Sequence, residues 1–538
     1  MRRWDLHVEL SAGRGPLFLR LAHGIAEAIR DGRLAPRAAL PGSRTLARAL
    51  RLHRNTVLAA YRELEREGWI ATEPAHGTFV AHDLPPRLSA RTAASEGAPE
   101  KVGFDLPPAP TWPRAPGELS DAVPPGVLQL LGGLPDPRLA PAAELARALR
   151  RALRRPEHLG YGDPRGHRRL RDALAGMLSA TRGIRHGSDG LLVTRGAQMA
   201  VAAAARALLA PRDLVAVEAL GYRPAWEALR STGARLVAVP VDGSGLDVER
   251  LAAIHVRQRV RAVYLTPHHH YPTTVALSPA RRMALLDFAA RERLVVIEDD
   301  YDNEFHYEGR PLLPLASLDR AGVVVYVGTL SKVLAPALRL GFAAAPKPVL
   351  ERLISERVRL DRQGDQVLEV AVAELIEDGE LQRSVWRARR AYEARRQALV
   401  AALRDRLGGA LTFSPPPGGM ALWCRVAPGI DADAWAAAAL AHGVAVQPGS
   451  SFTFDGRPTP HLRLGFARHE DAELREAVNR LAAAREPRSS RRPSTSRARR
   501  QAASRAARGS RRRIVQGRKS SPPDGSGHGR DRRDRRER

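Results

Sequence analysis

The stretch Val323–Phe342, VVVYVGTLSKVLAPALRLGF, joins a buried-strand pattern to the groups of a reactive site. Its apolar, β-branched start predicts a strand buried in a sheet. A small polar turn with Thr329 and Ser331 follows, then Lys332, and Arg339 seven residues later. Desolvation lowers the pKa of an amine, and a neutral lysine amine can form a Schiff base. The hydroxyls and the guanidinium are the donors that a phosphate needs beside it. The alternative to a reactive site is that Lys332 is an ordinary solvated lysine that follows a strand.

A second stretch, Leu294–Tyr307, reads LVVIEDDYDNEFHY and again ends a predicted buried strand in polar residues. Acids at the carboxyl end of a strand lie where α/β sheets bind ligands. An aspartate for the pyridine nitrogen and a lysine for the aldehyde are the protein groups that pyridoxal phosphate requires, and Tyr301 can bond a ring oxygen. With both stretches the chain resembles the class I aminotransferases of fold type I. Asp299 and Asp300 are both candidates for the ring contact, and the family pattern favours Asp299.

Length and composition predict a multidomain protein of the cytoplasm. The chain has 538 residues, more than one domain usually holds. Its single cysteine, Cys424, cannot form an internal disulfide. The start, MRRWDLHVEL, lacks the apolar stretch of a signal peptide, and no run reaches the roughly 20 apolar residues of a membrane helix. We therefore expect no membrane partner.

The charge of the chain is strongly basic, and half of the excess lies at one end. The net charge is +28, and residues 488–538 contain 19 Lys and Arg against 4 Asp and Glu. Residues 486–538 contain almost no apolar side chains, which predicts a disordered tail. The tail could hold nucleic acid through phosphates, or it could be a solvated extension without a role. The rest of the chain is still basic and suits a polyanionic partner.

Residues 12–82 predict three helices and a two-stranded wing. Apolar residues recur every four positions in the first helix, at Leu17, Leu21, Ile25 and Ile29. Ser43 is expected to cap a short second helix. A third helix ends at Gly68, and short strands flank a turn at Pro74–Gly77. This is the pattern of a winged helix-turn-helix.

Three segments of this region, PGSRTLARAL, RNTVLAAYRELEREGWI and GTFV, closely resemble the DNA-binding domain of GntR-type regulators. The resemblance implies that the third helix enters the major groove, where arginine can pair with guanine. The implied DNA contacts are Ser43, Arg44, Arg54, Asn55, Thr56 and Gly77. Tyr61 is expected to pack in the core. His53 stands where the family usually has a serine cap, and losing that cap would cost about 1 kcal/mol.

Residues 83–125 are rich in proline and predict an extended linker. From residue 126, the segment LGGLPDPRLAP resembles the opening of the aminotransferase-like part of MocR-type regulators, in which the same winged helix is fused to an aminotransferase fold. Strands and helices alternate from about residue 190 to 345, which predicts a mostly parallel α/β sheet. A smaller α+β lobe should complete residues 126–485.

The aminotransferase resemblance also implies a set of cofactor and effector contacts. The phosphate would be held by Gly196, Ala197, Gln198, Thr329, Ser331 and Arg339, together with Tyr161 of the partner subunit in a homodimer. Free N–H groups at a helix N-terminus bind phosphate well. Tyr222 would lie near the ring, and Arg463 would grip an α-carboxylate. Simple capping by Gln198, packing by Tyr222 and a surface position for Arg463 are the alternatives.

The segment His268–Thr274, HHHYPTT, stands where the family commonly reads Ser-His-Gln-Phe-Pro-Thr-Gly. Three adjacent histidines suggest a metal, but adjacent side chains diverge and no Glu or Cys lies at zinc-site spacing. We therefore expect no metal site. Thr274 in place of glycine is expected to alter the turn beneath the cofactor.

Together these patterns predict a sequence-specific transcriptional regulator that depends on pyridoxal phosphate. Its aminotransferase-like domain would sense the cofactor or an amino compound through an aldimine at Lys332, and a homodimer would bind two DNA half-sites. A dedicated enzyme is not expected, although residual aminotransferase activity is compatible with the pattern. The alternatives are an active aminotransferase with a DNA-binding appendage and a non-specific nucleic-acid binder driven by the tail.

Overall fold

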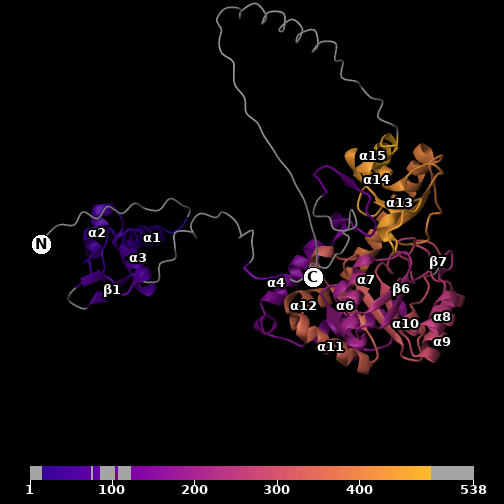
Figure 1. Ribbon diagram of the computed structural model, residues 1–538, viewed down its shortest axis with the longest axis horizontal. Coiled ribbons are helices and arrows are strands. Elements are labelled where there is room, and N and C mark those ends of the chain that lie inside the picture. Colours follow the sequence, from indigo (N-terminus) through magenta and orange to yellow (C-terminus); the bar gives the residue numbers. More distant parts are fainter. Residues whose placement is uncertain (1–14, 74–76, 85–102, 107–122, 310, 486–538) are drawn as a thin grey trace, which may run out of the picture. The chain divides into compact units, whose positions relative to one another are not determined.

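The computed structural model describes residues 15–73, 77–84, 103–106, 123–309 and 311–485. It divides the chain into two compact units, Met1–Trp112 and Pro113–Arg538 (Figure 1). The predicted tail, residues 486–538, lies wholly outside the described residues, as does most of the predicted linker.

The first unit contains three helices and a small sheet. The helices are α1 (Leu17–Arg30), α2 (Ser43–Leu50) and α3 (Arg54–Arg66), and the strands are β1 (Ile70–Glu73) and β2 (Gly77–Val80). The strands pair antiparallel, and residues 38–40 add backbone hydrogen bonds along β2. The inward faces of the helices form one core with Trp69 and Val80. The predicted winged helix-turn-helix is confirmed, and most of its expected wing turn lies outside the described residues.

Two expectations about the helix caps are wrong. Gly42 is the N-cap of α2, and Ser43 is the first helical residue. The cap of α3 is not lost, because His53 Nδ1 accepts a hydrogen bond from the Asn55 backbone N–H at 3.3 Å. An imidazole nitrogen can therefore replace the hydroxyl of a serine cap. Tyr61 packs in the core as expected and donates to the Pro41 carbonyl at 2.7 Å.

The second unit is built on a seven-stranded sheet with the order β4-β12-β11-β10-β9-β5-β6. The strands are β4 (Leu191–Thr194), β5 (Leu214–Glu218), β6 (Arg235–Val239), β9 (Val260–Leu265), β10 (Val295–Asp300), β11 (Val324–Thr329) and β12 (Gly341–Ala344). Only β12 runs antiparallel to its neighbours within this sheet, so the predicted mostly parallel sheet is confirmed.

Helices cover both faces of this sheet, which explains why its strands are apolar throughout. Alternate residues point to opposite faces: Ile297 and Val325 join one core cluster, and Val296 and Val324 join the other. The face with Ile297 and Val325 is covered by α6 (Ala197–Leu208), α7 (Arg223–Arg230) and α11 (Lys347–Asp361). The core on the face with Val296 and Val324 includes residues of α8 (Val248–Arg257), α9 (Pro279–Glu292) and α10 (Leu315–Leu318). A further group contains α4 (Ala142–Leu153), α5 (Arg168–Arg182) and α12 (Gln366–Glu377).

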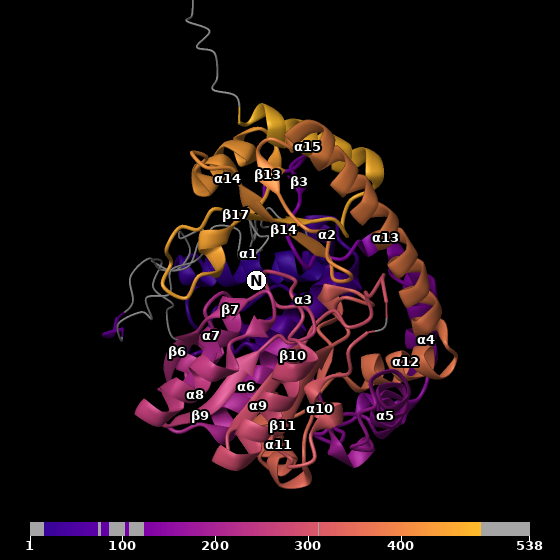
Figure 2. The same cartoon turned by 90° about the vertical axis from the view of Figure 1, so that its right-hand side faces the viewer.

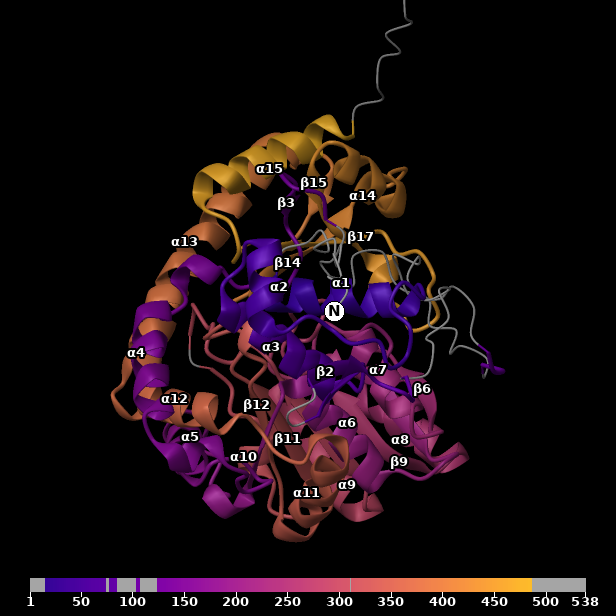
Figure 3. The same cartoon turned by 90° about the vertical axis from the view of Figure 1, so that its left-hand side faces the viewer.

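A smaller lobe follows in the chain, as the sequence predicts. It has an antiparallel sheet of β13 (Leu411–Thr412), β14 (Ala421–Val426), β17 (His461–Gly465) and β16 (Gln447–Pro448), with α14 (Ala432–Ala441) and α15 (Asp471–Ala483). The long helix α13 (Glu380–Leu407) runs from α12 to α15 and so joins the two lobes (Figures 2 and 3). Strand β3 (Leu128–Gln129) also belongs here, because it pairs with β15 (Val444–Ala445). A short hairpin, β7 (Val241–Asp242) with β8 (Gly245–Leu246), completes the strands of the described regions.

No helix among the described residues is both long enough and apolar enough to span a membrane.

The contact between β12 and the start of α6 requires a glycine, and this gives a test of the fold. A Cβ at Gly341 would lie 2.7 Å from the carbonyl carbon of Gly196 and 2.8 Å from the nitrogen of Ala197. Backbone atoms cannot move aside as a flexible side chain can, so Gly341→Ala should lower the free energy of unfolding by about 1–3 kcal/mol. Urea unfolding of the cofactor-free chain measures it.

Gly176→Ala is the matched control. Gly176 lies within α5, and a Cβ there would meet no described atom within 4 Å beyond its chain neighbours and the backbone of its own helix. Alanine at that position should stabilise the chain by about 0.5–1 kcal/mol, because glycine is a poor helix former. Equal effects of the two substitutions would contradict the close approach of β12 to α6.

Candidate functional site

A cavity of about 190 Å³ lies at the carboxyl ends of the central strands. Sequence reasoning predicts nine of its lining residues: Ala197, Gln198, Tyr222, Asp299, Tyr301, Thr329, Ser331, Lys332 and Arg339. Five others were not predicted: Gly132, Gly133, Thr266, Tyr271 and Pro336. Residues from six separate regions of the chain thus meet at the edge of the sheet where α/β proteins bind ligands.

Lys332 reaches the cavity from the turn after β11 and is partly buried. Its Nζ donates to the Gly133 carbonyl at 2.7 Å. Burial lowers the pKa of Lys332 to about 8, although the carboxylates of Asp302 and Asp299 act in the opposite direction. About a tenth of this amine is therefore neutral and nucleophilic at pH 7, far more than for an ordinary lysine.

Asp299 and Asp300 point to opposite faces of β10, as neighbours on a strand must. Asp299 lines the cavity and accepts from the Tyr264 hydroxyl at 2.7 Å through Oδ2. Burial raises the pKa of Asp299 to about 6, and the hydrogen bond from Tyr264 acts against that rise. Asp300 instead accepts from the Tyr326 hydroxyl at 2.7 Å and from Asn303. Of the two candidates, only Asp299 faces the cavity.

The start of α6 forms another wall of the cavity. Gly196 is the N-cap of this helix with φ of 82°, and a Cβ there would lie 3.1–3.2 Å from the Arg339 guanidinium. The unpaired N–H groups of a helix N-terminus and a guanidinium are together an anion site. Thr329 and Ser331 are buried close by. Gln198 donates to the Pro224 carbonyl at 2.6 Å, and no side chain caps α6, so the capping alternative for Gln198 is wrong.

Arg463 lies beside the cavity and is fully buried on β17. Its guanidinium carbon sits 4.3 Å from the centre of the Tyr271 ring, and its Nε donates to the Pro272 carbonyl at 3.2 Å. A Cβ at Gly132 would overlap this guanidinium. A surface position for Arg463 is therefore wrong, since the side chain is directed between two segments that line the cavity.

Tyr161 is not brought to the cavity. Its side chain is 82% exposed, and the Arg362 guanidinium lies over its ring at 4.4 Å. The structure of one chain leaves the expected contact of Tyr161 with a partner subunit as a prediction.

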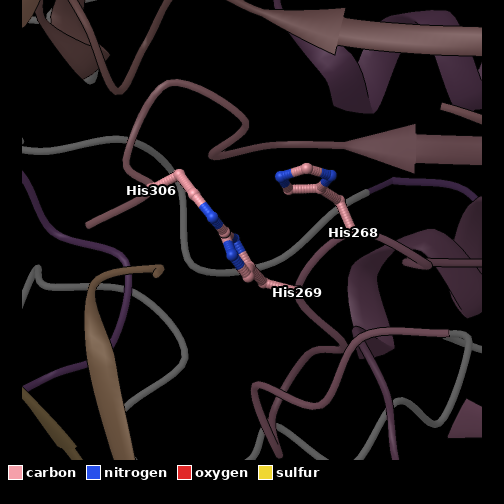
Figure 4. A group of neighbouring side chains, drawn as sticks. All are labelled: His268, His269 and His306. Carbon is pink, nitrogen blue, oxygen red and sulfur yellow. The ribbon is translucent and has the colours of Figure 1, made fainter. Parts of the chain in front are cut away.

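The histidine run folds differently from the expectation of diverging side chains. His270 does turn away, with its ring nitrogens near Thr273 Oγ1 and the Leu220 carbonyl. The rings of His268 and His269, however, lie 4.6 Å apart between centroids, and His306 joins them (Figure 4). His306 lies in the same acidic stretch as Asp299, but no spacing in the sequence links it to the run.

Five of the six predicted DNA-contacting residues lie at the starts of α2 and α3, and Gly77 lies on β2. Arg54 Nε approaches Ser43 Oγ at 3.4 Å, and Arg44, Arg54 and Asn55 are exposed. Thr56 is half-buried one residue further along α3, and Gly77 is exposed at the start of β2. A helix with exposed arginine and asparagine at its N-terminus has the side chains that read base edges in a major groove.

Comparisons with known proteins agree with this arrangement. Residues 17–80 match the family described as "Bacterial regulatory proteins, gntR family", and residues 133–481 match "Aminotransferase class I and II". The "Probable rhizopine catabolism regulatory protein MocR" of Rhizobium meliloti is 30% identical over 472 residues, which cover 87% of this chain and 94% of that protein. This chain belongs to the MocR-type branch of the GntR family of transcriptional regulators.

Two further relatives represent the whole chain and its larger unit. The "HTH-type transcriptional regulator TauR" of Rhodobacter capsulatus is 31% identical over 88% of this chain and 97% of that protein. Among solved structures, α-aminoadipate aminotransferase LysN from Thermus thermophilus matches with a TM-score of 0.63 and 32% sequence identity. The match covers 67% of this chain and 92% of LysN, whose structure was determined in complex with N-(5'-phosphopyridoxyl)-L-leucine.

The aminotransferase fold of this MocR-type regulator implies the use of pyridoxal phosphate. The cavity fits that group, because several buried polar atoms beside it have no hydrogen-bond partner among the described residues: Asp299 Oδ1, Tyr301 Oη, Gln198 Oε1 and an Arg463 nitrogen. Buried polar atoms without partners cost about 1–3 kcal/mol each. A polar ligand in the cavity would satisfy them.

Thr274 gives a test of strain below the cavity. Its φ is 64°, a left-handed conformation that is costly for a β-branched residue, by about 1–3 kcal/mol. Thr274→Gly should therefore raise the free energy of unfolding by about 1 kcal/mol, after the added freedom of glycine in the unfolded chain is subtracted. Thermal unfolding of the cofactor-free chain measures it.

The adjacent residue serves as its control. Thr273 has no positive φ, and its hydroxyl lies 2.6 Å from His270 Nδ1. Thr273→Gly should destabilise the same chain. If both substitutions destabilise it equally, Thr274 carries no backbone strain.

Proposed function

We propose that this transcriptional regulator holds pyridoxal phosphate at Lys332 and senses either the cofactor or an amino compound there. The observation that carries the proposal is the partly buried Lys332 amine at a cavity that Asp299 also lines, with an Asp299 Oδ1 that has no hydrogen-bond partner among the described residues. An amine with a depressed pKa and a buried carboxylate are the two groups that this cofactor requires.

The remaining cavity residues supply the other contacts of the proposal. Bound pyridoxal phosphate supplies a carbonyl that a primary amine captures. Asp299 would keep a proton on the ring nitrogen, and the Tyr301 hydroxyl would donate to the ring oxygen. The start of α6 would bind the phosphate together with Thr329, Ser331 and Arg339. Arg463 has an unpartnered nitrogen among the described residues, and it would bind the carboxylate of an amino-acid effector.

The proposal includes a homodimer on two DNA half-sites. Tyr161 is exposed, which leaves its hydroxyl available to the phosphate in a second copy of the chain. Two copies would place two α3 helices on DNA, as helix-turn-helix dimers do on paired half-sites. An effector changes DNA binding only by as much as its affinity differs between two states of the dimer.

Lys332→Ala is the direct test of the cofactor proposal. The variant should lack the visible absorption band that pyridoxal phosphate gains on capture by a lysine. Borohydride reduction of the loaded wild-type chain, followed by peptide mass mapping, should place the cofactor on Lys332. The chain has only four lysines, at 101, 332, 347 and 519, so the mapping is unambiguous. Lys347→Ala, which removes an exposed lysine, is the control and should keep the band.

The pH dependence of cofactor uptake tests whether the pKa of the Lys332 amine is lowered. The neutral fraction of a group with a pKa of about 8 rises about tenfold between pH 6 and pH 7 and levels off above pH 8. The rate of uptake by the cofactor-free chain should follow that curve in stopped-flow absorbance. A rate that keeps rising to pH 10 would mean that Lys332 has an ordinary pKa.

Selection of the genomic DNA fragments that the chain binds tests the proposal that it is a sequence-specific regulator. Genomic fragments bound by the cofactor-loaded chain at physiological salt should contain a few sites with repeated half-sites. Arg54→Ala should weaken binding to such a site by about 10–100-fold, the loss expected for one base contact by arginine. Arg66→Ala, at the other end of α3, removes the same charge and is the matched control.

Two other outcomes would change the conclusion. Binding that is equal for all fragments, and that disappears when residues 486–538 are deleted, would favour a non-specific binder driven by its tail. No DNA binding, together with turnover of amino donors, would favour the aminotransferase alternative.

A further inference from the structure

Three histidines from two loops converge beside the cavity. His268 and His269 follow β9, and His306 follows β10 (Figure 4). Each offers one ring nitrogen such that all three nitrogens lie within 4.8 Å of one another. The rings of His269 and His306 are nearly parallel, with centroids 6.4 Å apart. No other group of this kind occurs in the part of the chain that the structure describes.

The cluster has unused ligand capacity. His268 is 5% exposed, and neither of its ring nitrogens has a hydrogen-bond partner among the described residues. Neither nitrogen of His306 has a partner at full hydrogen-bond geometry, although the Glu308 backbone interacts with that ring. A buried imidazole normally satisfies at least one nitrogen, since leaving one unpaired costs about 1–3 kcal/mol. Two histidines without a hydrogen bond of full geometry at any ring nitrogen therefore point to a missing ligand.

The third histidine is already oriented. His269 Nδ1 lies 2.8 Å from Asp302 Oδ1, and both side chains are buried. This bond fixes the ring and leaves Nε2 as the free ligand atom. A carboxylate bonded to the far nitrogen of an imidazole is the usual outer partner of a metal-ligating histidine.

We propose that His268, His269 and His306 bind one divalent transition metal ion of the zinc class. Three imidazoles without a thiolate suit Zn²⁺, Co²⁺, Ni²⁺ or Cu²⁺, whereas Ca²⁺ and Mg²⁺ require oxygen ligands. Zn–N bonds of about 2.0–2.1 Å in a tetrahedron place the nitrogens roughly 3.4 Å apart. The ligand nitrogens, now within 4.8 Å of one another, must therefore approach by up to about 1.4 Å. A water would take the fourth position.

The site joins the two loops that carry aromatic walls of the cofactor cavity. Tyr271 follows His269 by two residues, and Tyr301 precedes Asp302 by one. Tyr271 and Tyr301 themselves contact each other, with ring centroids 5.9 Å apart. A metal that links His269 and His306 would hold these loops together, so it acts on the cavity without entering it.

The experiment uses the full chain without an affinity tag, after treatment with a chelator. Titration with Co²⁺ should show one ion per chain and the intense visible d–d absorption of a tetrahedral complex, and Zn²⁺ should displace it. Zn²⁺ should also raise the temperature of thermal unfolding, because it binds only the folded arrangement. None of these measurements depends on pyridoxal phosphate.

Variants decide whether the three histidines are the ligands. His306→Ala, at a half-buried position that tolerates truncation, should weaken Co²⁺ binding at least 100-fold and abolish the Zn²⁺-induced rise. His268→Ser should do the same where circular dichroism shows that it folds. His255→Ala is the matched control: His255 also has a buried ring nitrogen without a partner among the described residues, but it lies outside the cluster.

Three results would overturn the proposal. The first is octahedral Co²⁺ absorption alone, and the second is equal affinity of the wild type and His306→Ala. The third is a Zn²⁺ effect that disappears in His255→Ala.

Discussion

The parallel register of β10 and β11 is the constraint on which the cofactor cavity depends. Asp299 pairs with Val327 and Asp300 with Gly328, so the two strands end side by side. The turn after β11 then returns Lys332 to the level of Asp299. Both faces of these strands are covered by helices, so a buried polar group needs a hydrogen-bond partner or a place at a strand end. The same desolvation that lowers the pKa of the lysine raises that of the aspartate.

Much of this arrangement could be predicted from the sequence, because strand ends concentrate polar residues in short stretches. The turn at Lys332 and the acids after Ile297 are visible in the sequence as abrupt changes from apolar to polar. The choice between Asp299 and Asp300 could not be made from periodicity. Alternation places them on opposite faces, but both faces are buried, so the sequence pattern does not show which face borders the cavity.

Contacts between distant segments could not be predicted. Tyr264 looks like an ordinary apolar position of β9, and only the structure shows its hydroxyl on Asp299. The buried pair of Asp136 with Arg395 of α13 joins residues 259 positions apart at 2.8 Å, and no sequence pattern links the two. His306 is likewise assigned to the histidine cluster by folding alone. The capping role of His53 in the first unit could not be predicted either. It depends on the orientation of the imidazole ring, which places Nδ1 beside the Asn55 backbone N–H.

The contact between Lys332 and Gly133 connects the chemistry of the cavity to the arrangement of the lobes. Gly133 follows a segment held by the small lobe: the Leu130 N–H donates to the Ala445 carbonyl at 2.9 Å, and the Gly132 N–H donates to Gln447 Oε1 at 3.0 Å. Lys332 follows β11 of the large sheet, so its donation to the Gly133 carbonyl links that sheet to the segment held by the small lobe. An amine engaged with a carbonyl compound cannot keep that donation unchanged. Under the proposed function, ligand capture at Lys332 would therefore act directly on the small lobe. The resulting shift between lobe arrangements would be limited by the difference in ligand affinity between them.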